Sequence, residues 1–422
     1  MRDGLDKVAL LCPGQGSQHV GMGQALAAAF PTARRAFEEA SEALGYDVAR
    51  LCAEGPAEAL DQTERSQPAL LTCSVASWRV LSEELGLSPA AGAGHSLGEL
   101  SALACAGVLS LSEAAPLVAA RGRAMQQAAP PGSGRMAAVF GLPVDQVEAA
   151  CAASSRPGEP ACVATNNSAE QTVISGAAAA VERAGQELTR RGGVVHPLKI
   201  SIPAHSPLMA PAARALEEAL DRVTVREAAW PVLANATNEP CREPAAIRSS
   251  LIQQLTRPVR WRQAMETLVQ SGVQWVLEAG PRTVLRDLFK LEHPRVVAFS
   301  AGDPEGVKAV QAFLRARVSA GGEPQRVRFL ARCLAIAAAT RNTSTDPQRY
   351  ALTVVEPHRK LREIRRVAGE SGTADDAALR EAAELLRRIL RGKGVPEPER
   401  RASLDALRTE TCTQALLPDL EP

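Results

Sequence analysis

The sequence lacks the features typical of membrane proteins, nucleic-acid-binding proteins and secreted proteins. No apolar run reaches the roughly 18 residues that a membrane-spanning helix needs, so no membrane partner is expected. The 48 basic and 47 acidic residues give a net charge of +1, which provides no electrostatic basis for binding nucleic acid. The first residues contain only a short apolar core that runs into a glycine turn, which indicates a first strand rather than a secretory signal.

The nine cysteines are not arranged as a metal site or a disulfide framework. They are scattered without any C-x-x-C pair, at positions 12, 52, 73, 105, 151, 162, 241, 333 and 412. This spacing argues against bound zinc and against structural disulfides. We therefore expect a protein of the reducing cytoplasm, in which most cysteines are small buried hydrophobic residues.

The apolar patterns of the first part of the chain predict an α/β fold. Val8–Cys12 is a short apolar run that ends at a Pro-Gly turn, as a buried strand does. Helical patterns follow at 23–42 and 67–85, and a further helix is expected at about 99–108. Strands, tight turns and helices in alternation favour a largely parallel sheet.

Residues 135–200 have a different pattern, which predicts a small inserted subdomain. Strand and helix patterns follow one another there in the order βαββαβ, which is typical of a ferredoxin-like fold. The α/β pattern then resumes, with strands expected at 231–235, 273–280 and 296–302 and helices at 246–256, 260–271 and 305–317. A large subdomain is therefore expected at 1–134 and 201–318.

The end of the chain differs again in composition. Residues 319–324 read SAGGEP, which predicts a short flexible linker. Residues 325–422 are rich in arginine and mainly helical in pattern. Thr373 is predicted to cap a helix there. The apolar face of that helix contains Leu379, Ala383, Leu386 and Leu390.

Gly94-His95-Ser96-Leu97-Gly98 matches G-x-S-x-G, the nucleophile elbow. In this motif the serine is held in a strained conformation on a sharp strand-to-helix turn, and the glycines let neighbouring chains approach closely. The N-terminus of the following helix then points at whatever binds the hydroxyl. A small-residue turn that matches by chance is the alternative. The position of Ser96 between a strand pattern and a helix pattern favours a nucleophile.

A nucleophilic serine needs further groups around it, and the sequence offers candidates. His95 is next to the serine in an extended turn, so its ring should point elsewhere. His205 lies where the chain returns from the inserted subdomain, and either a catalytic or a structural role is open. The glycine loop around Gln15 either presents backbone N–H groups into a cleft or is an ordinary turn. Arg121 is either a solvated surface residue, which its pattern favours, or a bidentate clamp for a carboxylate.

Seven segments, taken in order, resemble the malonyl-CoA:acyl-carrier-protein transacylase family and the acyltransferase domains of polyketide synthases. They cover about residues 6–318 and read PGQGSQ (13–18), GHSLGEL (94–100), RGRAM (121–125), TNN (165–167), SIPAH (201–205), LIQQLTRPVRW (251–261) and EAGPRTVL (278–285). The resemblance implies an acyltransferase domain at 1–318. Its large subdomain would be α/β-hydrolase-like with a parallel sheet, and residues 135–200 would be the ferredoxin-like insertion.

The resemblance also implies catalytic roles. Ser96 would take the acyl group from coenzyme A as an ester, and His205 would act as general base and then as general acid. A backbone carbonyl near Gln254 would hold the other ring nitrogen of the histidine and fix its tautomer without a second charge. The backbone N–H groups of Gln15 and Leu97 would form the oxyanion hole.

Arg121 and Gln254 are implied to belong to the substrate site. Arg121 would pair with the free carboxylate of a malonyl group, and because a buried carboxylate is costly to desolvate alone, it would disfavour neutral acyl chains. The segment SIPAH resembles the discrete malonyl enzymes and favours malonyl over methylmalonyl, although one methyl is worth only about 1–3 kcal/mol.

The implied reaction is malonyl transfer from malonyl-CoA to an acyl carrier protein in the cytoplasm, for fatty acid or polyketide synthesis, without a cofactor. An acyl hydrolase of the same fold that clears carrier proteins is the alternative, although it would be expected to lack Arg121. An inactive scaffold is a third reading. Residues 325–422 have no counterpart in the minimal transacylase. Their excess of basic residues makes them either a docking surface for acidic carrier proteins or a helical packing appendage.

Overall fold

The computed structural model describes residues 7–411 and 413, with the exception of residues 131, 199, 201, 322–324, 341, 344–345 and 372. The chain divides into two units, Met1–Gln311 and Ala312–Pro422. No helix among the described residues is long and apolar enough to cross a membrane.

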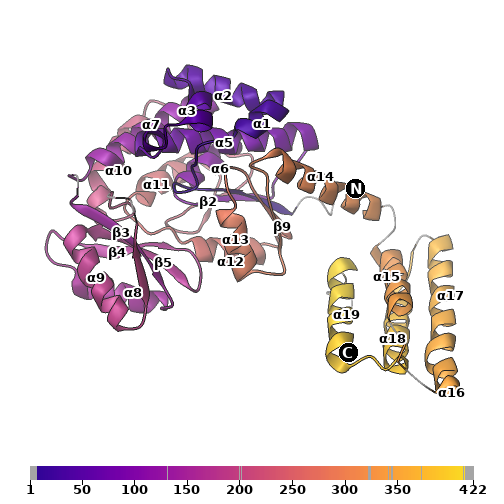
Figure 1. The fold of residues 1–422 in the computed structure, drawn as a ribbon. Coiled ribbons are helices and arrows are strands. Elements are labelled where there is room, and N and C mark those ends of the chain that lie inside the picture. The colour runs from indigo at the N-terminus through magenta and orange to yellow at the C-terminus, as the bar shows by residue number, and fades with distance from the viewer. Residues whose placement is uncertain are drawn as a thin grey trace. The chain divides into compact units, whose positions relative to one another are not determined.

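The first unit contains a six-stranded sheet in the order β10-β9-β1-β2-β7-β8 (Figure 1). Its strands are β1 (Val8–Cys12), β2 (Ala91–Gly94), β7 (Val232–Leu233), β8 (Pro240–Cys241), β9 (Trp275–Glu278) and β10 (Val297–Ser300). All neighbours pair in parallel except β8, which is antiparallel to β7. The largely parallel sheet expected from the sequence is confirmed.

The three central strands end at one edge of this sheet. Cys12 of β1 pairs with Gly94 of β2, and Leu11 pairs with Glu278 of β9. The glycine loop after β1 and the turn that contains Ser96 therefore leave the sheet side by side, as ligand-binding loops of parallel sheets do.

Helices pack against this sheet on both sides. The helices α12 (Trp261–Gln270) and α13 (Val284–Glu292) share an apolar core with β1, β2 and β9. Figure 1 shows α5 (Thr63–Leu85) and α6 (Leu97–Cys105) on the opposite side. The other helices of this part are α1 (Gln24–Ala29), α2 (Pro31–Leu44), α3 (Val48–Glu54), α4 (Ala57–Leu60), α7 (Leu111–Gln127), the 3₁₀ turn η1 (Pro207–Met209), α10 (Ala210–Leu220) and α11 (Pro244–Gln254).

The helical pattern at 23–42 forms two helices rather than one continuous helix. Phe30 lies between α1 and α2 with an extended backbone, at φ −127° and ψ 116°. Pro31 lacks the N–H that a continuous helix would use, and it disfavours helical backbone at the residue before it. The proline therefore breaks the expected helix.

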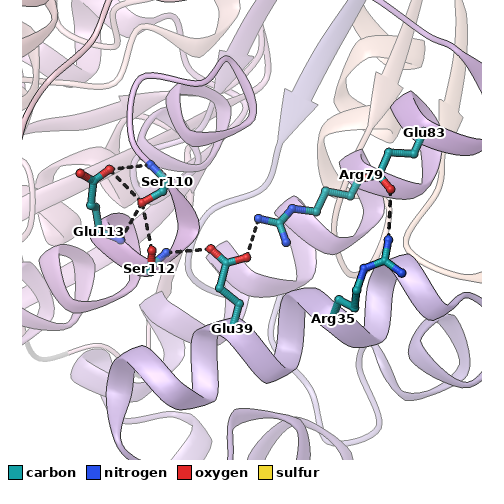
Figure 2. Close-up of polar contacts among 7 residues, drawn as sticks. All are labelled: Arg35, Glu39, Arg79, Glu83, Ser110, Ser112 and Glu113. Carbon is teal, nitrogen blue, oxygen red and sulfur yellow. Dashed lines mark hydrogen bonds and ion pairs between the residues drawn. The ribbon is translucent and has the colours of Figure 1, made fainter.

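Polar contacts fix the beginning of α7, the helix that carries Arg121 (Figure 2). Ser110 accepts a hydrogen bond from the Glu113 N–H at 3.2 Å, and the Glu113 carboxylate accepts one from the Ser110 N–H at 2.8 Å, which is a capping box. Glu39 of α2 accepts from the Ser112 N–H at 3.1 Å and pairs with Arg79 of α5 at 2.7 Å. The start of α7 is thereby tied to two neighbouring helices.

The inserted subdomain is a four-stranded antiparallel sheet in the order β4-β5-β3-β6 (Figure 1). Its elements are β3 (Gly134–Phe140), α8 (Val144–Ser154), β4 (Ala161–Asn166), β5 (Gln171–Ala177), α9 (Ala178–Arg190) and β6 (Val194–Pro197). Both helices share an apolar core with the sheet. The βαββαβ order expected for a ferredoxin-like fold is confirmed. Backbone hydrogen bonds of Val259 with Asn166 (3.0 Å) and Ala164 (2.8 Å) tie this sheet to the large subdomain.

The second unit is helical, as the sequence predicts. It contains α15 (Gln325–Ala339), α16 (Pro347–Tyr350), the π-helix η2 (Ala351–Val355), α17 (Glu356–Ser371), α18 (Asp376–Gly392) and α19 (Glu397–Thr411). It has its own core, which includes Leu361, Leu379, Leu386 and Leu390. The cap of α18 differs from the prediction, because Asp375 rather than Thr373 accepts the Ala378 N–H at 2.8 Å. Asp375 directly precedes the first helical residue, where a cap must lie.

The helix α14 (Pro304–Gly321) extends into the linker predicted at 319–324. Residues 319–321 are helical, and residues 322–324 lie outside the described residues. Serine and alanine are acceptable in helices, and glycine is common where a helix ends, so composition alone placed the boundary too early.

Candidate active site

Ser96 occupies a strained turn between β2 and α6. Its backbone has φ 53° and ψ −109°, a conformation that residues other than glycine rarely adopt. A Cβ on Gly94 would lie 1.9 Å from the carbonyl of Gly98, and a Cβ on Gly98 would lie 2.0 Å from the carbonyl oxygen of Cys12. The two glycines of the motif are therefore a steric requirement of the turn.

Asn235, in the turn that follows β7, holds the Ser96 turn. Its Oδ1 accepts a hydrogen bond from the Ser96 N–H at 2.7 Å, and its Nδ2 donates to the Gly94 carbonyl at 2.6 Å. Asn235 was not predicted to be a site residue. The available signal was a polar residue at the carboxyl end of the strand expected at 231–235.

The imidazole of His205 lies against the serine hydroxyl. Its Nε2 is 2.8 Å from Ser96 Oγ, and its Nδ1 is 2.8 Å from the carbonyl oxygen of Gln254. Because a carbonyl oxygen only accepts, Nδ1 carries the proton and donates it. The lone pair of Nε2 therefore faces the serine hydroxyl, which is the arrangement that a general base requires.

Burial keeps this histidine neutral. His205 is only 3% exposed. Burial, and next the charge of Arg121, lower the pKa of His205 to about 3, although the hydrogen bond to the Gln254 carbonyl opposes the shift. The ring is therefore a neutral acceptor across the whole physiological pH range.

Arg121 is a buried cation, so the surface role that its pattern favoured is excluded. It is 1% exposed. One terminal nitrogen donates to Gln67 Oε1 at 2.7 Å, and the other donates to Gln254 Oε1 at 2.7 Å and lies 3.4 Å from Ser96 Oγ. Its Nε has no hydrogen-bond partner within the described part of the chain. Burial lowers the pKa of Arg121 to about 10, which leaves the side chain charged at neutral pH.

Gln254 and Glu99 form a buried support behind the serine. Gln254 Nε2 donates to the Ser96 carbonyl at 3.0 Å and to Glu99 at 2.7 Å. Glu99 also accepts hydrogen bonds from the Asn235 N–H at 2.9 Å and from the Ser250 hydroxyl at 2.6 Å. Burial raises the pKa of Glu99, whereas these hydrogen bonds lower it. Glu99 was not selected from the sequence, because a helical glutamate is usually solvated.

A cavity of about 660 Å³ opens beside Ser96, between the two subdomains. Its wall includes the glycine loop at 14–17, strand residues of the small sheet and one face of α13. Apolar side chains contribute much of this wall, among them Met125, Met136, Val173, Leu198, Ile200, Ile202, Leu285, Leu288 and Leu291. Arg121 and Gln254 are not among the lining residues, and the arginine approaches the cavity behind Ser96.

The remaining predicted residues lie around this cavity. His95 turns away from the serine, with Nε2 2.8 Å from Asn167 Oδ1. Gln15 lies in the loop beside the serine turn and donates its side-chain amide to Thr63 at 3.2 Å. No backbone hydrogen bond from the N–H of Gln15 or Leu97 occurs within the described residues. Both N–H groups are therefore available donors, as expected for Leu97 at the first position of a helix.

Two other expectations concern SIPAH and the cysteines. Ile202 and Ala204 line the cavity next to His205, while Ser201 lies outside the described residues. The eight cysteines that the structure describes are free; Cys412 lies outside the described residues. The described residues contain no group of three or more His, Cys, Asp and Glu side chains that could hold a metal ion.

Comparison with known proteins shows one consistent likeness. Residues 9–291 match the acyl transferase domain family. The malonyl CoA-acyl carrier protein transacylase of Salmonella typhimurium is 42% identical over 306 residues, which cover 72% of this chain and 99% of the relative. An acyl carrier protein S-malonyltransferase from Vibrio cholerae is 43% identical with a TM-score of 0.70, covering 72% of this chain and 100% of that structure.

A further similar structure contains two proteins. It is that of a type II polyketide-synthase acyl-carrier protein in complex with its malonyl-transacylase. The match has a TM-score of 0.70 and 41% identity, and it covers 71% of this chain and 97% of that chain.

Proposed function

The chain belongs to the acyl transferase domain family, and on that premise we propose that it transfers malonyl groups from malonyl-CoA to the phosphopantetheine thiol of an acyl carrier protein. The similar proteins carry names for this reaction. The observation that carries the proposal is that His205 and the buried Arg121 both lie within hydrogen-bond reach of the Ser96 hydroxyl, at 2.8 Å and 3.4 Å. The product is a building block for fatty acid or polyketide synthesis.

In the first half of the reaction, Ser96 Oγ attacks the thioester carbonyl while His205 Nε2 takes the hydroxyl proton. The carbon–sulfur bond breaks, coenzyme A leaves with that proton, and the malonyl group stays on Ser96 as an ester. The N–H groups of Gln15 and Leu97 stabilise the oxyanion, and loss of one such donor typically costs about 3–4 kcal/mol. Gln254 holds the histidine through its backbone carbonyl.

In the second half, the same groups act on the carrier protein. His205 takes the proton of the phosphopantetheine thiol, and the sulfur attacks the Ser96 ester carbonyl. The ester bond breaks and the serine recovers its proton from the histidine. These steps need only the nucleophile, the base and the oxyanion donors, so the proposal includes no cofactor.

Arg121 selects the acyl group in this proposal. Its contacts are with uncharged groups, namely Gln67, Gln254 and Ser96, so its charge is open to a carboxylate beside the serine. A malonyl carboxylate there gains a charge-assisted hydrogen bond, which a neutral acyl chain cannot form. Cytoplasmic location belongs to the proposal as well, and the free cysteines support it.

Labelling with radioactive malonyl-CoA tests the proposal. The protein should retain one malonyl group per chain after denaturation, and the Ser96→Ala variant should retain none. An unlabelled wild-type protein would exclude the acyl-enzyme. Rapid release of free malonate without a carrier protein would instead support the hydrolase.

A further inference from the structure

The helical second unit contains a basic groove that the proposed chemistry does not use. The groove has a volume of about 660 Å³ and is lined by residues of α17 and α18. Its five cationic side chains are those of Arg359, Lys360, Arg362, Arg366 and Arg388. All five residues are exposed to solvent.

Three of these cations form no ion pair with a described residue. Lys360 pairs with Glu381, and Arg366 pairs with Glu363 and Glu370. In contrast, no ion pair of Arg359, Arg362 or Arg388 is present among the described residues. The lining of the groove also contains two carboxylates, those of Glu356 and Glu363, so its five cations leave a net positive charge that favours a negatively charged partner.

Apolar side chains also belong to the lining of the groove, and others are exposed elsewhere on η2 and α17. Pro357 and Leu385 are largely buried and contribute to the lining of the groove. Leu352, Val355 and Val367, from η2 and α17, are 59%, 54% and 51% exposed. The cations of the groove together with the apolar side chains of Pro357 and Leu385 form a surface that complements an amphipathic helix with acidic edges.

We propose that this groove is a second docking surface for the acyl carrier protein, through an acidic amphipathic helix of that protein. The inference rests on the proposed function, which makes the acidic carrier protein a substrate. Nucleic acid fits less well, because no aromatic side chain among the lining residues of the groove offers a stacking surface. The three relatives match 71–72% of this chain and nearly their own whole length. The match to the family model ends at residue 291, so the groove, at residues 356–388, lies outside that match.

The groove is proposed to contribute to binding of the carrier protein and to take no part in the chemical steps. A carrier protein held by a tethered second site has a raised effective concentration at the active site. Its contribution is therefore expected in the KM for the carrier protein and in its salt dependence. The reaction with malonyl-CoA, which forms the Ser96 ester before the carrier protein binds, should be unaffected.

Two charge reversals on α18 provide a matched test. Arg388 and Arg380 are both exposed, and neither forms an ion pair with a described residue, but only Arg388 lines the groove. In the full-length protein at low salt, Arg388→Glu should raise the KM for the holo-carrier protein about three- to ten-fold. The Arg359→Glu/Arg362→Glu variant should raise it further, Arg380→Glu should leave it unchanged, and 0.5 M salt should remove the differences.

Each outcome decides the proposal. If malonyl labelling of Ser96 is normal and the KM is the same in wild-type, Arg388→Glu and Arg380→Glu proteins, the docking surface is excluded while the proposed function stands. Equal rises in both variants exclude it too, since they indicate a general charge effect. Loss of binding to single-stranded RNA or anionic vesicles in Arg388→Glu, with unchanged carrier kinetics, would assign the groove to that ligand instead. Absence of the label in wild-type protein would refute the proposed function itself.

Discussion

Buried hydrogen bonds link Arg121 to Glu99 through the side-chain amide of Gln254. The amide oxygen of Gln254 accepts from Arg121 at 2.7 Å, and its amide nitrogen donates to Glu99 at 2.7 Å. The charges of Arg121 and Glu99 stabilise each other across this amide without a direct ion pair. The same amide nitrogen also holds the Ser96 carbonyl.

Replacing Arg121 with alanine should therefore impair malonyl transfer selectively. We expect kcat/KM for malonyl-CoA to fall by about 100- to 1,000-fold, because the substrate carboxylate would be buried without a partner. Acetyl transfer should fall by about ten-fold or less. Arg123→Ala is the control, since Arg123 of the same helix is exposed and pairs with Glu64 at 3.1 Å. Equal losses for malonyl-CoA and acetyl-CoA would remove the selective role of Arg121.

The lowered pKa of His205 predicts a particular pH dependence. Because burial and Arg121 lower it to about 3, the free enzyme keeps its base neutral below the usual histidine pKa. With acetyl-CoA as donor, the acid limb of kcat/KM should lie well below pH 6.5. The unfolded chain takes up this proton more readily than the folded chain, so His205 should also cost stability as the pH falls from about 6.5 to 3.

Arg121→Gln tests the cause of this shift. Removing the cation should raise the pKa of His205 and move the acid limb of acetyl transfer to higher pH, because the neighbouring charge disfavours imidazolium. An NMR titration of the imidazole carbons would follow the same change directly. An acid limb that stays in place would show that burial alone sets the pKa.

At the scale of elements, the motifs that the sequence predicted best were local. The nucleophile elbow was predictable because one turn requires glycine at both position 94 and position 98. The βαββαβ insertion was predictable because its hydrophobic periodicity changes within a few residues. Asn235 and Glu99 were missed because their roles depend on contacts more than 100 positions away, such as the Asn235 bond to the Ser96 N–H. No local pattern records such contacts.

The elbow itself can be tested with two alanine substitutions. In Gly98→Ala the new Cβ would lie 2.0 Å from the Cys12 carbonyl oxygen, so α6 must move away from β1. We expect a loss of about 1–3 kcal/mol in the free energy of unfolding, together with loss of Ser96 malonylation. Gly185→Ala in α9 places its Cβ 3.4 Å from the Val195 side chain, and should leave activity intact and change stability by less than about 1 kcal/mol. Normal malonylation of Gly98→Ala would show that the turn tolerates a side chain there.

At the scale of the whole molecule, the chain carries separate cores. The core of residues 327–407 includes Leu386, which is fully buried, and it shares no residue with the cores around the two sheets. Units with separate cores can unfold in separate transitions. The sequence predicts the second unit as helical from local patterns. It does not predict the groove, because the groove depends on how α17 and α18 pack.

Leu386→Ala should weaken the second unit alone. Removing this buried side chain is expected to cost about 2–5 kcal/mol of the stability of the helical unit. Calorimetry should show its thermal transition moving to lower temperature, with the rate of Ser96 malonylation unchanged at 25 °C. Loss of malonylation together with one common transition would contradict the independent unfolding of the helical unit.

A chase experiment with the isolated malonyl-enzyme tests most directly whether Ser96 passes its acyl group to the carrier protein. The labelled protein is separated from coenzyme A and mixed with holo-carrier protein, and the label on each protein is followed by rapid quench. Malonyl should move from Ser96 to the carrier thiol at a rate no slower than steady-state turnover. Label that remains on the enzyme, or that appears as free malonate while the carrier protein stays unlabelled, would contradict transfer through Ser96.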